Sequence, residues 1–113
     1  MPRLVYRAAA RRDIAQIAAY IEQKSQSRAA ADEFVESITA HCEHLATLSS
    51  MIGRPRSDLR PGYRSVTFGN YVIFLRYGND DGPRSHLYII HILHGARDLD
   101  AYFKEASSDN EDA

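Results

Sequence analysis

The sequence predicts an α+β fold in which two helices pack on a small, mainly antiparallel sheet. Residues 8–49 contain two stretches in which apolar side chains recur every three or four residues, the period of an amphipathic helix. Residues 63–94 contain three short runs rich in aromatic and β-branched residues, separated by turn-forming residues, which is typical of strands. A short apolar run, Leu4-Val5-Tyr6, precedes the helices and is expected to form an edge strand.

The first helix is predicted over residues 8–23 and the second over residues 28–49. The stripe of the first is Ile14, Ile17, Ala18 and Ile21, and Asp13 lies largely off it. The stripe of the second is Ala31, Phe34, Val35, Ile38, Cys42, Leu45 and Leu48. Ser25 or Ser27, in the link, is the candidate N-cap of the second helix. Helices joined so closely should form an antiparallel helical hairpin, and the sheet is the surface on which both stripes can be buried.

The three later strands are predicted over residues 63–68, 71–77 and 86–94. Gly69-Asn70 is a two-residue hairpin turn, and residues 78–83 form a longer turn. The last run is apolar on both faces, which is typical of a central strand. Asp98 is a candidate N-cap for a short C-terminal helix over residues 99–106. Residues 1–106 are therefore expected to form a single domain, and residues 107–113 an acidic disordered tail.

The hairpin turn determines which side chains share a face of the sheet. One face carries Arg64, Val66, Phe68, Tyr71, Ile73 and Leu75. This face is mostly apolar and should pack on the helices. The other face carries Tyr63, Ser65, Thr67, Val72, Phe74 and Arg76. It mixes aromatic, polar and charged residues, and we expect it to be an open binding surface.

Composition indicates an ordinary globular chain of 113 residues with a net charge of −1. No apolar run is long enough for a membrane span, and the N-terminus lacks the pattern of a signal peptide. Cys42 is the one cysteine, so no internal disulfide can form and a cytoplasmic location is expected. Residues 54–97 contain seven arginines against three aspartates. This bias predicts a basic face for an acidic or nucleic-acid-associated partner.

Two groups of residues could carry chemistry. In His41-Cys42-Glu43-His44, Cys42 belongs to the buried stripe and no second pair of ligands completes a tetrahedral set, so we expect no metal site and no cofactor. His94 and Arg97, at the end of the last strand, could act in acid–base catalysis on a phosphate. They could equally be structural, with Arg97 pairing an acidic neighbour. Without a phosphate-binding glycine loop or a nucleophile elbow, the sequence favours a binding module over an enzyme.

Three segments, in this order, resemble the RelE/ParE toxin superfamily of bacterial toxin–antitoxin systems. The first comprises Gly53-Arg54-Pro55-Arg56 and Asp58-Leu59-Arg60-Pro61-Gly62-Tyr63-Arg64. The second is Phe68-Gly69-Asn70-Tyr71-Val72-Ile73-Phe74-Leu75. The third is Ile92-Leu93-His94-Gly95-Ala96-Arg97-Asp98. The resemblance extends from residue 4 to about residue 103 and is closest to the ParE branch.

The resemblance implies a toxin of a type II system that inhibits DNA gyrase. It also implies a hetero-oligomer with a ParD-like ribbon-helix-helix antitoxin, which alone would contact operator DNA, and no membrane partner. Two alternatives stand: a ribosome-dependent mRNA endoribonuclease of the RelE type, and a detoxified relative that only binds its antitoxin and regulates transcription. The lysines of the nuclease branch correspond to positions near Tyr63 and Ser65, and its hairpin arginine corresponds to Val72. The cationic side chains that would bind a phosphodiester are therefore missing at these positions.

The partner-binding candidates are Arg54, Arg56, Arg60, Tyr63, Arg64, Phe74, Arg76 and Arg97. For the nuclease alternative, the catalytic candidates are His94, Arg97, Arg64 and Arg76.

Overall fold

The computed structural model describes residues 2–78 and 86–95. They form two helices and a five-stranded sheet in the strand order β1-β5-β4-β3-β2. The elements are β1 (Arg3–Tyr6), α1 (Ala8–Ser25), α2 (Arg28–Ala46), β2 (Arg54–Pro55), β3 (Arg64–Phe68), β4 (Tyr71–Gly78) and β5 (His86–His94). β1 pairs with β5 in parallel, and the other pairs are antiparallel. The predicted α+β class is confirmed, whereas the predicted helix at 99–106 and tail at 107–113 lie outside the described residues.

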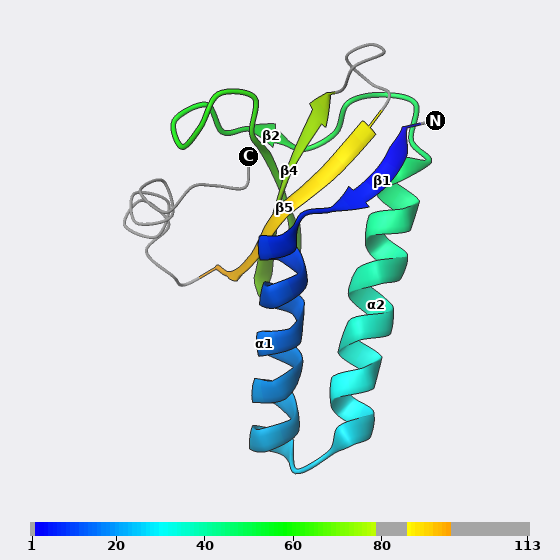
Figure 1. Ribbon diagram of the computed structural model, residues 1–113, viewed down its shortest axis with the longest axis vertical. Helices are drawn as coiled ribbons and strands as arrows, with labels where there is room; N and C mark the ends of the chain where they lie inside the picture. The colour runs from blue at the N-terminus through cyan, green and yellow to red at the C-terminus, as the bar shows by residue number, and fades with distance from the viewer. Residues whose placement is uncertain (1, 79–85, 96–113) are drawn as a thin grey trace.

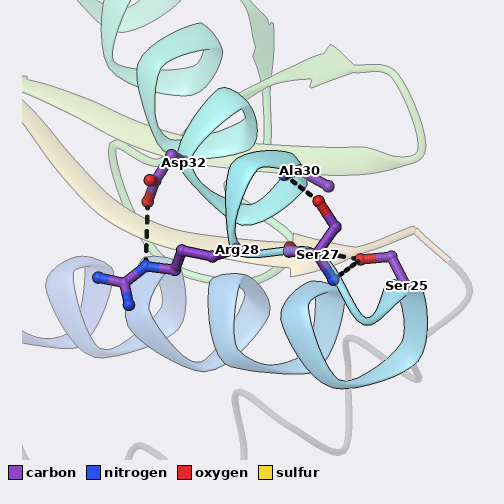
Figure 2. Close-up of polar contacts among 5 residues, drawn as sticks. All are labelled: Ser25, Ser27, Arg28, Ala30 and Asp32. Atoms are coloured by element: carbon purple, nitrogen blue, oxygen red, sulfur yellow. Dashed lines mark hydrogen bonds and ion pairs between the residues drawn. The ribbon is translucent and has the colours of Figure 1, made fainter.

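The two helices lie side by side and extend beyond the sheet as a helical hairpin (Figure 1). Ser27 is the N-cap of α2, because its Oγ accepts a hydrogen bond of 3.0 Å from Ala30 N–H. The N–H of Ser27 in turn donates to Ser25 Oγ at 3.2 Å, and Arg28 pairs with Asp32 one turn into the helix (Figure 2). These local bonds set the tight link that makes α1 and α2 antiparallel neighbours.

Five predicted boundaries shift by one to three residues, and two of these shifts extend β1 back to Arg3 and β4 forward to Gly78. α1 continues to Ser25 and ends on Gln26, whose φ of 59° is left-handed. α2 ends at Ala46 rather than at residue 49, because Thr47 turns back to donate its hydroxyl to the His44 carbonyl. β3 begins at Arg64 rather than at Tyr63.

One short strand, β2, lies between α2 and β3, where no strand is predicted from the sequence. β2 pairs antiparallel with β3, with Arg54 opposite Ser65 and Pro55 opposite Arg64. Proline is tolerated at that position because β2 is the edge of the sheet.

The core lies between the sheet and the helices. Ile38, Cys42 and Leu45 of α2 pack on the face of the sheet that carries Ile73, Leu75, Leu87, Ile89 and Ile92. We call this the inner face and its opposite the outer face. The β3–β4 hairpin has the predicted register, from Phe68 opposite Tyr71 to Arg64 opposite Leu75, so the predicted division of side chains between the two faces is confirmed for this hairpin.

β5 carries one irregularity in its pairing with β4. Phe74 is opposite His91 and Leu75 is opposite Ile89, so Ile90 is an extra residue on β5. The extra residue packs on the outer face beside Phe74 and Leu93, while Ile89 and Ile92 both pack on the inner face. β5 is therefore apolar on both sides, as predicted for a central strand.

Asp13 closes the edge of β5 that β1 leaves unpaired. The pairing of β1 with β5 ends at Ile89. Beyond it, Oδ2 of Asp13 accepts a hydrogen bond of 2.9 Å from Ile92 N–H and lies 3.2 Å from Nδ1 of His91. Asp13 and His91 are both buried. The expectation that Asp13 lies away from the core is therefore corrected: its carboxylate takes the place of a further strand.

Candidate functional site

The outer face of the sheet is divided into two parts, and the first is covered by a loop. The loop spans residues 56–63 and is closed by a hydrogen bond of 2.7 Å from Arg56 N–H to the Tyr63 carbonyl. Its side chains Leu59 and Tyr63 pack over the cluster of Phe74, Ile90 and Leu93. We call this part, with Val72, the apolar half.

Phe74 forms the floor of the apolar half and does not reach its surface. Its side chain is fully buried. Phe74 is predicted from the sequence to contact a partner, but in the folded chain its ring supports the residues above it. Arg56 lies on top, with Cζ 5.9 Å from the centre of the Phe74 ring, and forms two hydrogen bonds of 3.1 Å to Asp58. The Arg56 guanidinium holds the pKa of the Asp58 carboxyl below its usual value.

The second part of the outer face is built around Tyr88. Cζ of Arg76, its cross-strand neighbour on β4, lies 4.8 Å from the centre of the Tyr88 ring. Cζ of Arg7, the residue between β1 and α1, lies 5.3 Å from the same centre. His86 stacks on the ring at 5.5 Å with its plane 15° away. Arg3, on β1, is aligned with His86 of β5, and its side chain is exposed. We call these five residues the basic half.

Of the basic half, only Arg76 was predicted from the sequence. Arg3 and Arg7 were missed because the pairing of β1 with β5 joins residues more than eighty positions apart, and the apolar pattern of either strand does not show it. The alternation of side chains along β1 is a signal for Arg3. Leu4 and Tyr6 pack on the inner face, so Arg3 and Val5 point to the outer face.

Arg64 is on the inner face and is engaged with the backbone. Its Nε–H donates to the Ile52 carbonyl at 2.8 Å and its Nη2–H donates to the Gly53 carbonyl at 2.9 Å. Gly53 has φ +91°, and a Cβ there would meet the Ser65 carbonyl oxygen at 3.0 Å. The two N–H donors of Arg64 thus fasten the turn at Ile52 and Gly53 to the start of β3, and the guanidinium points away from the outer face.

The remaining partner-binding candidates lie around the loop. Arg54 is exposed on β2, on the same face as Ser65, while Arg60 and Tyr63 are half-buried in the loop. Arg97 lies outside the described residues. The structure thus brings Arg54, Arg56, Arg60 and Tyr63 to the apolar half and Arg76 to the basic half, and separates Arg64 from both.

The described members of the nuclease set do not converge. His94 is opposite Tyr71 at one end of the β4–β5 ladder, with its ring 5.6 Å from the Tyr71 ring. Arg76 is five residues further along β4, which corresponds to about 17 Å of extended strand. Arg64 shares the inner face with His94, but it is opposite Leu75, four residues or about 14 Å along β4 from Tyr71. No two of these three side chains are placed to act on one phosphate.

The histidines of α2 belong to separate environments. His41 packs beside the Phe68 ring at 4.9 Å, and its pKa is lowered by burial and by the neighbouring His44. Cys42 is buried in the core and His44 is exposed. Within the described ranges, no three histidine, cysteine or acidic side chains are grouped to hold a metal ion. None of the helices described is both long and apolar enough to cross a membrane.

Comparison with known proteins decides the family. The family model described as the ParE toxin of type II toxin-antitoxin system, parDE, matches residues 4–99. The chain belongs to the ParE toxin family. The resemblance drawn from its three segments is therefore confirmed, and so is its assignment as the toxin of a type II system. A search of curated proteins finds no match. The ParE match includes the apolar half, every residue of the basic half except Arg3, and the Asp13 contact with β5.

Proposed function

We propose that this ParE-family toxin acts by binding DNA gyrase, and that it blocks replication without cleaving nucleic acid itself. The observation that carries the proposal is the separation of His94, Arg64 and Arg76. A nuclease must direct its base and its cationic groups at one phosphate. Here one arginine holds backbone carbonyls on the inner face, and the other two groups lie about 17 Å apart along the ladder.

The outer face has the composition of a protein-binding surface. It combines half-buried aromatic side chains with arginines, the residue types enriched where proteins meet. We infer a ParD-like ribbon-helix-helix antitoxin as the neutralising partner, with operator DNA contacted only by that partner. The complex would be a hetero-oligomer in the cytoplasm. Arg54, Arg56, Arg60, Tyr63, Arg76 and Arg97 remain the proposed contacts.

Two reactions measured in parallel test the target. Purified toxin is added to a gyrase supercoiling assay and to ribosomes translating a labelled mRNA. We expect inhibited supercoiling and intact mRNA, and addition of the antitoxin should restore supercoiling. Cleaved mRNA with normal supercoiling would instead support the RelE-type endoribonuclease.

Growth of a host that lacks the antitoxin tests whether the chain is toxic at all. Inducing the toxin alone should arrest growth, and inducing it together with the product of the neighbouring small gene should not. Normal growth with the toxin alone, at an expression level confirmed in the soluble fraction, would support the detoxified co-regulator.

A further inference from the structure

The loop over residues 56–63 has an inner side that covers the apolar half and an outer side that does not. The covering is done by Leu59 and Tyr63, which pack over the apolar cluster. The loop extends beyond the strands that it connects (Figure 1). The side chains or backbone on its outer side are exposed: Ser57, Asp58, Pro61 and Gly62. Exposed loops held on a rigid sheet are where binding residues are commonly found.

The backbone of Arg56 joins the two ends of the loop. Its N–H donates to the Tyr63 carbonyl at 2.7 Å. Its carbonyl accepts from Leu59 N–H at 2.9 Å and from Arg60 N–H at 3.3 Å. A further bond of 3.2 Å runs from Tyr63 N–H to the Arg60 carbonyl. The loop is therefore folded by its own backbone, which is typical of compact surface loops whose ends lie close together.

Asp58 fixes the side chain of Arg56. It accepts two hydrogen bonds of 3.1 Å, one from Nε–H and one from Nη2–H of Arg56. The side chain of Asp58 is 60% exposed, whereas that of Arg56 is only 15% exposed. So exposed a pair contributes little to stability, but a two-bond pair has a defined geometry. Asp58 therefore determines where Arg56 lies over Phe74 more than it stabilises the fold.

The tip of the loop, Arg60-Pro61-Gly62, presents two kinds of contact group. The guanidinium of Arg60 takes part in none of the ion pairs and side-chain hydrogen bonds formed among the described residues. Pro61 supplies an exposed apolar ring and a fixed φ. Gly62 has φ +80°, and a Cβ there would lie 3.7 Å from Cδ of Arg76, so the tip ends against the stem of Arg76.

We propose that the loop over residues 56–63 is the element by which the toxin contacts gyrase. The tip makes the contact, and Asp58 is a positioning residue that acts through Arg56. The inference rests on the function proposed above, because gyrase is the partner. The surface that fits the tip carries a carboxylate for Arg60 beside an apolar patch for Pro61.

The internal bonds of the loop favour a folded partner. A loop that is already ordered loses little conformational freedom on binding, so it can dock on a preformed surface at low entropic cost. A segment that orders only when it binds, as an antitoxin tail does, can wrap around a surface without such a projection. The loop is therefore assigned to the target of the toxin rather than to its antitoxin.

Three measurements on each full-length variant test the inference. The first is the toxin concentration that half-inhibits supercoiling by purified gyrase. The second is the affinity for the product of the neighbouring small gene, measured by calorimetry. The third is urea denaturation, which shows whether a loss of inhibition is only a loss of folded protein.

Arg60→Gln tests the tip. It should raise the half-inhibitory concentration roughly tenfold or more, because arginines at the centre of an interface contribute strongly to binding. The control is Arg12→Gln, which removes the same charge from an exposed position on α1 and should change the value by less than about twofold. Affinity for the antitoxin should stay within about threefold in both variants.

Asp58→Asn tests positioning, because charge and geometry predict opposite signs. The substitution makes the toxin more positive, so attraction to an acidic surface alone would make it a stronger inhibitor. If Asp58 positions Arg56, inhibition should instead weaken by about threefold or more at unchanged stability. The control is Asp32→Asn, since Asp32 is 63% exposed and also pairs with an arginine, and it should leave inhibition within about twofold.

Gly62→Ala tests the loop backbone without changing charge. Its control is Gly69→Ala in the β3–β4 turn, because both glycines are exposed and have a positive φ, +80° and +60°. A Cβ at Gly62 makes only an ordinary contact, and one at Gly69 meets nothing within 4 Å. Both variants therefore strain the backbone in a similar way and should lose similar stability. Only Gly62→Ala should weaken inhibition, by about threefold or more.

Three results would overturn the inference alone: equal effects of the loop variants and their controls, stronger inhibition by Asp58→Asn, or a parallel loss of antitoxin affinity in the loop variants. The last result would assign the loop to the antitoxin. Absence of inhibition by the unmodified toxin would overturn the gyrase proposal and this inference together, so the two failures are distinguishable.

Discussion

The carboxylate of Asp13, on α1, accepts a hydrogen bond of 2.9 Å from the backbone N–H of Ile92, inside β5. The same oxygen lies 3.2 Å from Nδ1 of His91, and a carboxylate can only accept, so the contact requires a hydrogen on Nδ1. A helix side chain thereby completes the edge of a strand whose neighbour ends too early. The helical hairpin is fixed to the sheet by polar bonds as well as by the core.

Asp13→Ala should lower the free energy of unfolding by about 1–3 kcal/mol, because it leaves the buried N–H of Ile92 without an acceptor. Asp13→Asn keeps an oxygen that can accept and should cost less. Urea denaturation measures both. The comparison variant is Asp32→Ala, whose side chain is 63% exposed and whose ion pair with Arg28 should be worth less than about 0.5 kcal/mol. Equal losses at the two aspartates would contradict this role for Asp13.

The same substitution at two serines of α2 should have opposite effects. Ser27→Ala removes the N-cap hydrogen bond to Ala30 N–H and should destabilise the fold by about 1 kcal/mol. Ser37→Ala, at an exposed position within the helix, should be neutral or stabilise by up to about 0.5 kcal/mol, because alanine is the better helix former. Thermal denaturation of both variants gives the comparison. A loss at Ser37 equal to that at Ser27 would remove the capping explanation.

Arg64 should matter for stability rather than for chemistry. Arg64→Lys should cost about 1–2 kcal/mol, because an ammonium cannot donate to the Ile52 and Gly53 carbonyls as the fork does. Arg54→Lys, on exposed β2, should change stability by less than about 0.5 kcal/mol. Chemical denaturation is measured beside growth arrest. Loss of toxicity in Arg64→Lys at unchanged stability would point to a direct role at the target.

Cys42 should be unreactive until the chain unfolds. Burial raises the pKa of its thiol from 9.0 to about 11, and the nearby Tyr6 hydroxyl only partly offsets this. As pH rises above 9, the unfolded thiol loses its proton before the folded one does, so the unfolded state is favoured and stability falls between pH 9 and pH 11.

Labelling with a chromogenic disulfide reagent, in buffer and in urea, checks the thiol. Because Cys42 is the one cysteine, the reaction reports on a single site. Rapid stoichiometric labelling of the folded toxin would show that the thiol is accessible without unfolding, contrary to this expectation.

Local patterns in the sequence predicted most of the described fold. The Gly69-Asn70 turn has a positive φ at the glycine and leads into the expected register, so the side chains of β3 and β4 could be assigned to faces from the sequence. Helical periodicity likewise located both helices within a few residues. These predictions succeeded because each depends on residues close together in the chain.

The features that were missed depend on contacts between distant residues. Asp13 looked like a surface residue from its position in the helical pattern. Its carboxylate bonds to the edge of β5 only because β1 ends before that part of β5 is paired. Phe74 looked available to a partner, because the covering by Leu59 and Tyr63 follows from how the loop folds back. Arg3 and Arg7 joined Arg76 only through the parallel pairing of the first strand with the last.

That pairing also has a consequence for biosynthesis. Arg3 is aligned with His86 and Tyr6 with Ile89, so β1 is made first but obtains its partner only after nearly all of the described chain has been translated. Contacts between such distant residues close late and slow folding. The helical hairpin can form early on the nascent chain, whereas the sheet with its apolar and basic halves is complete only after β5 has been made. A toxin assembled in this order acquires the outer face of its sheet as one of its last steps.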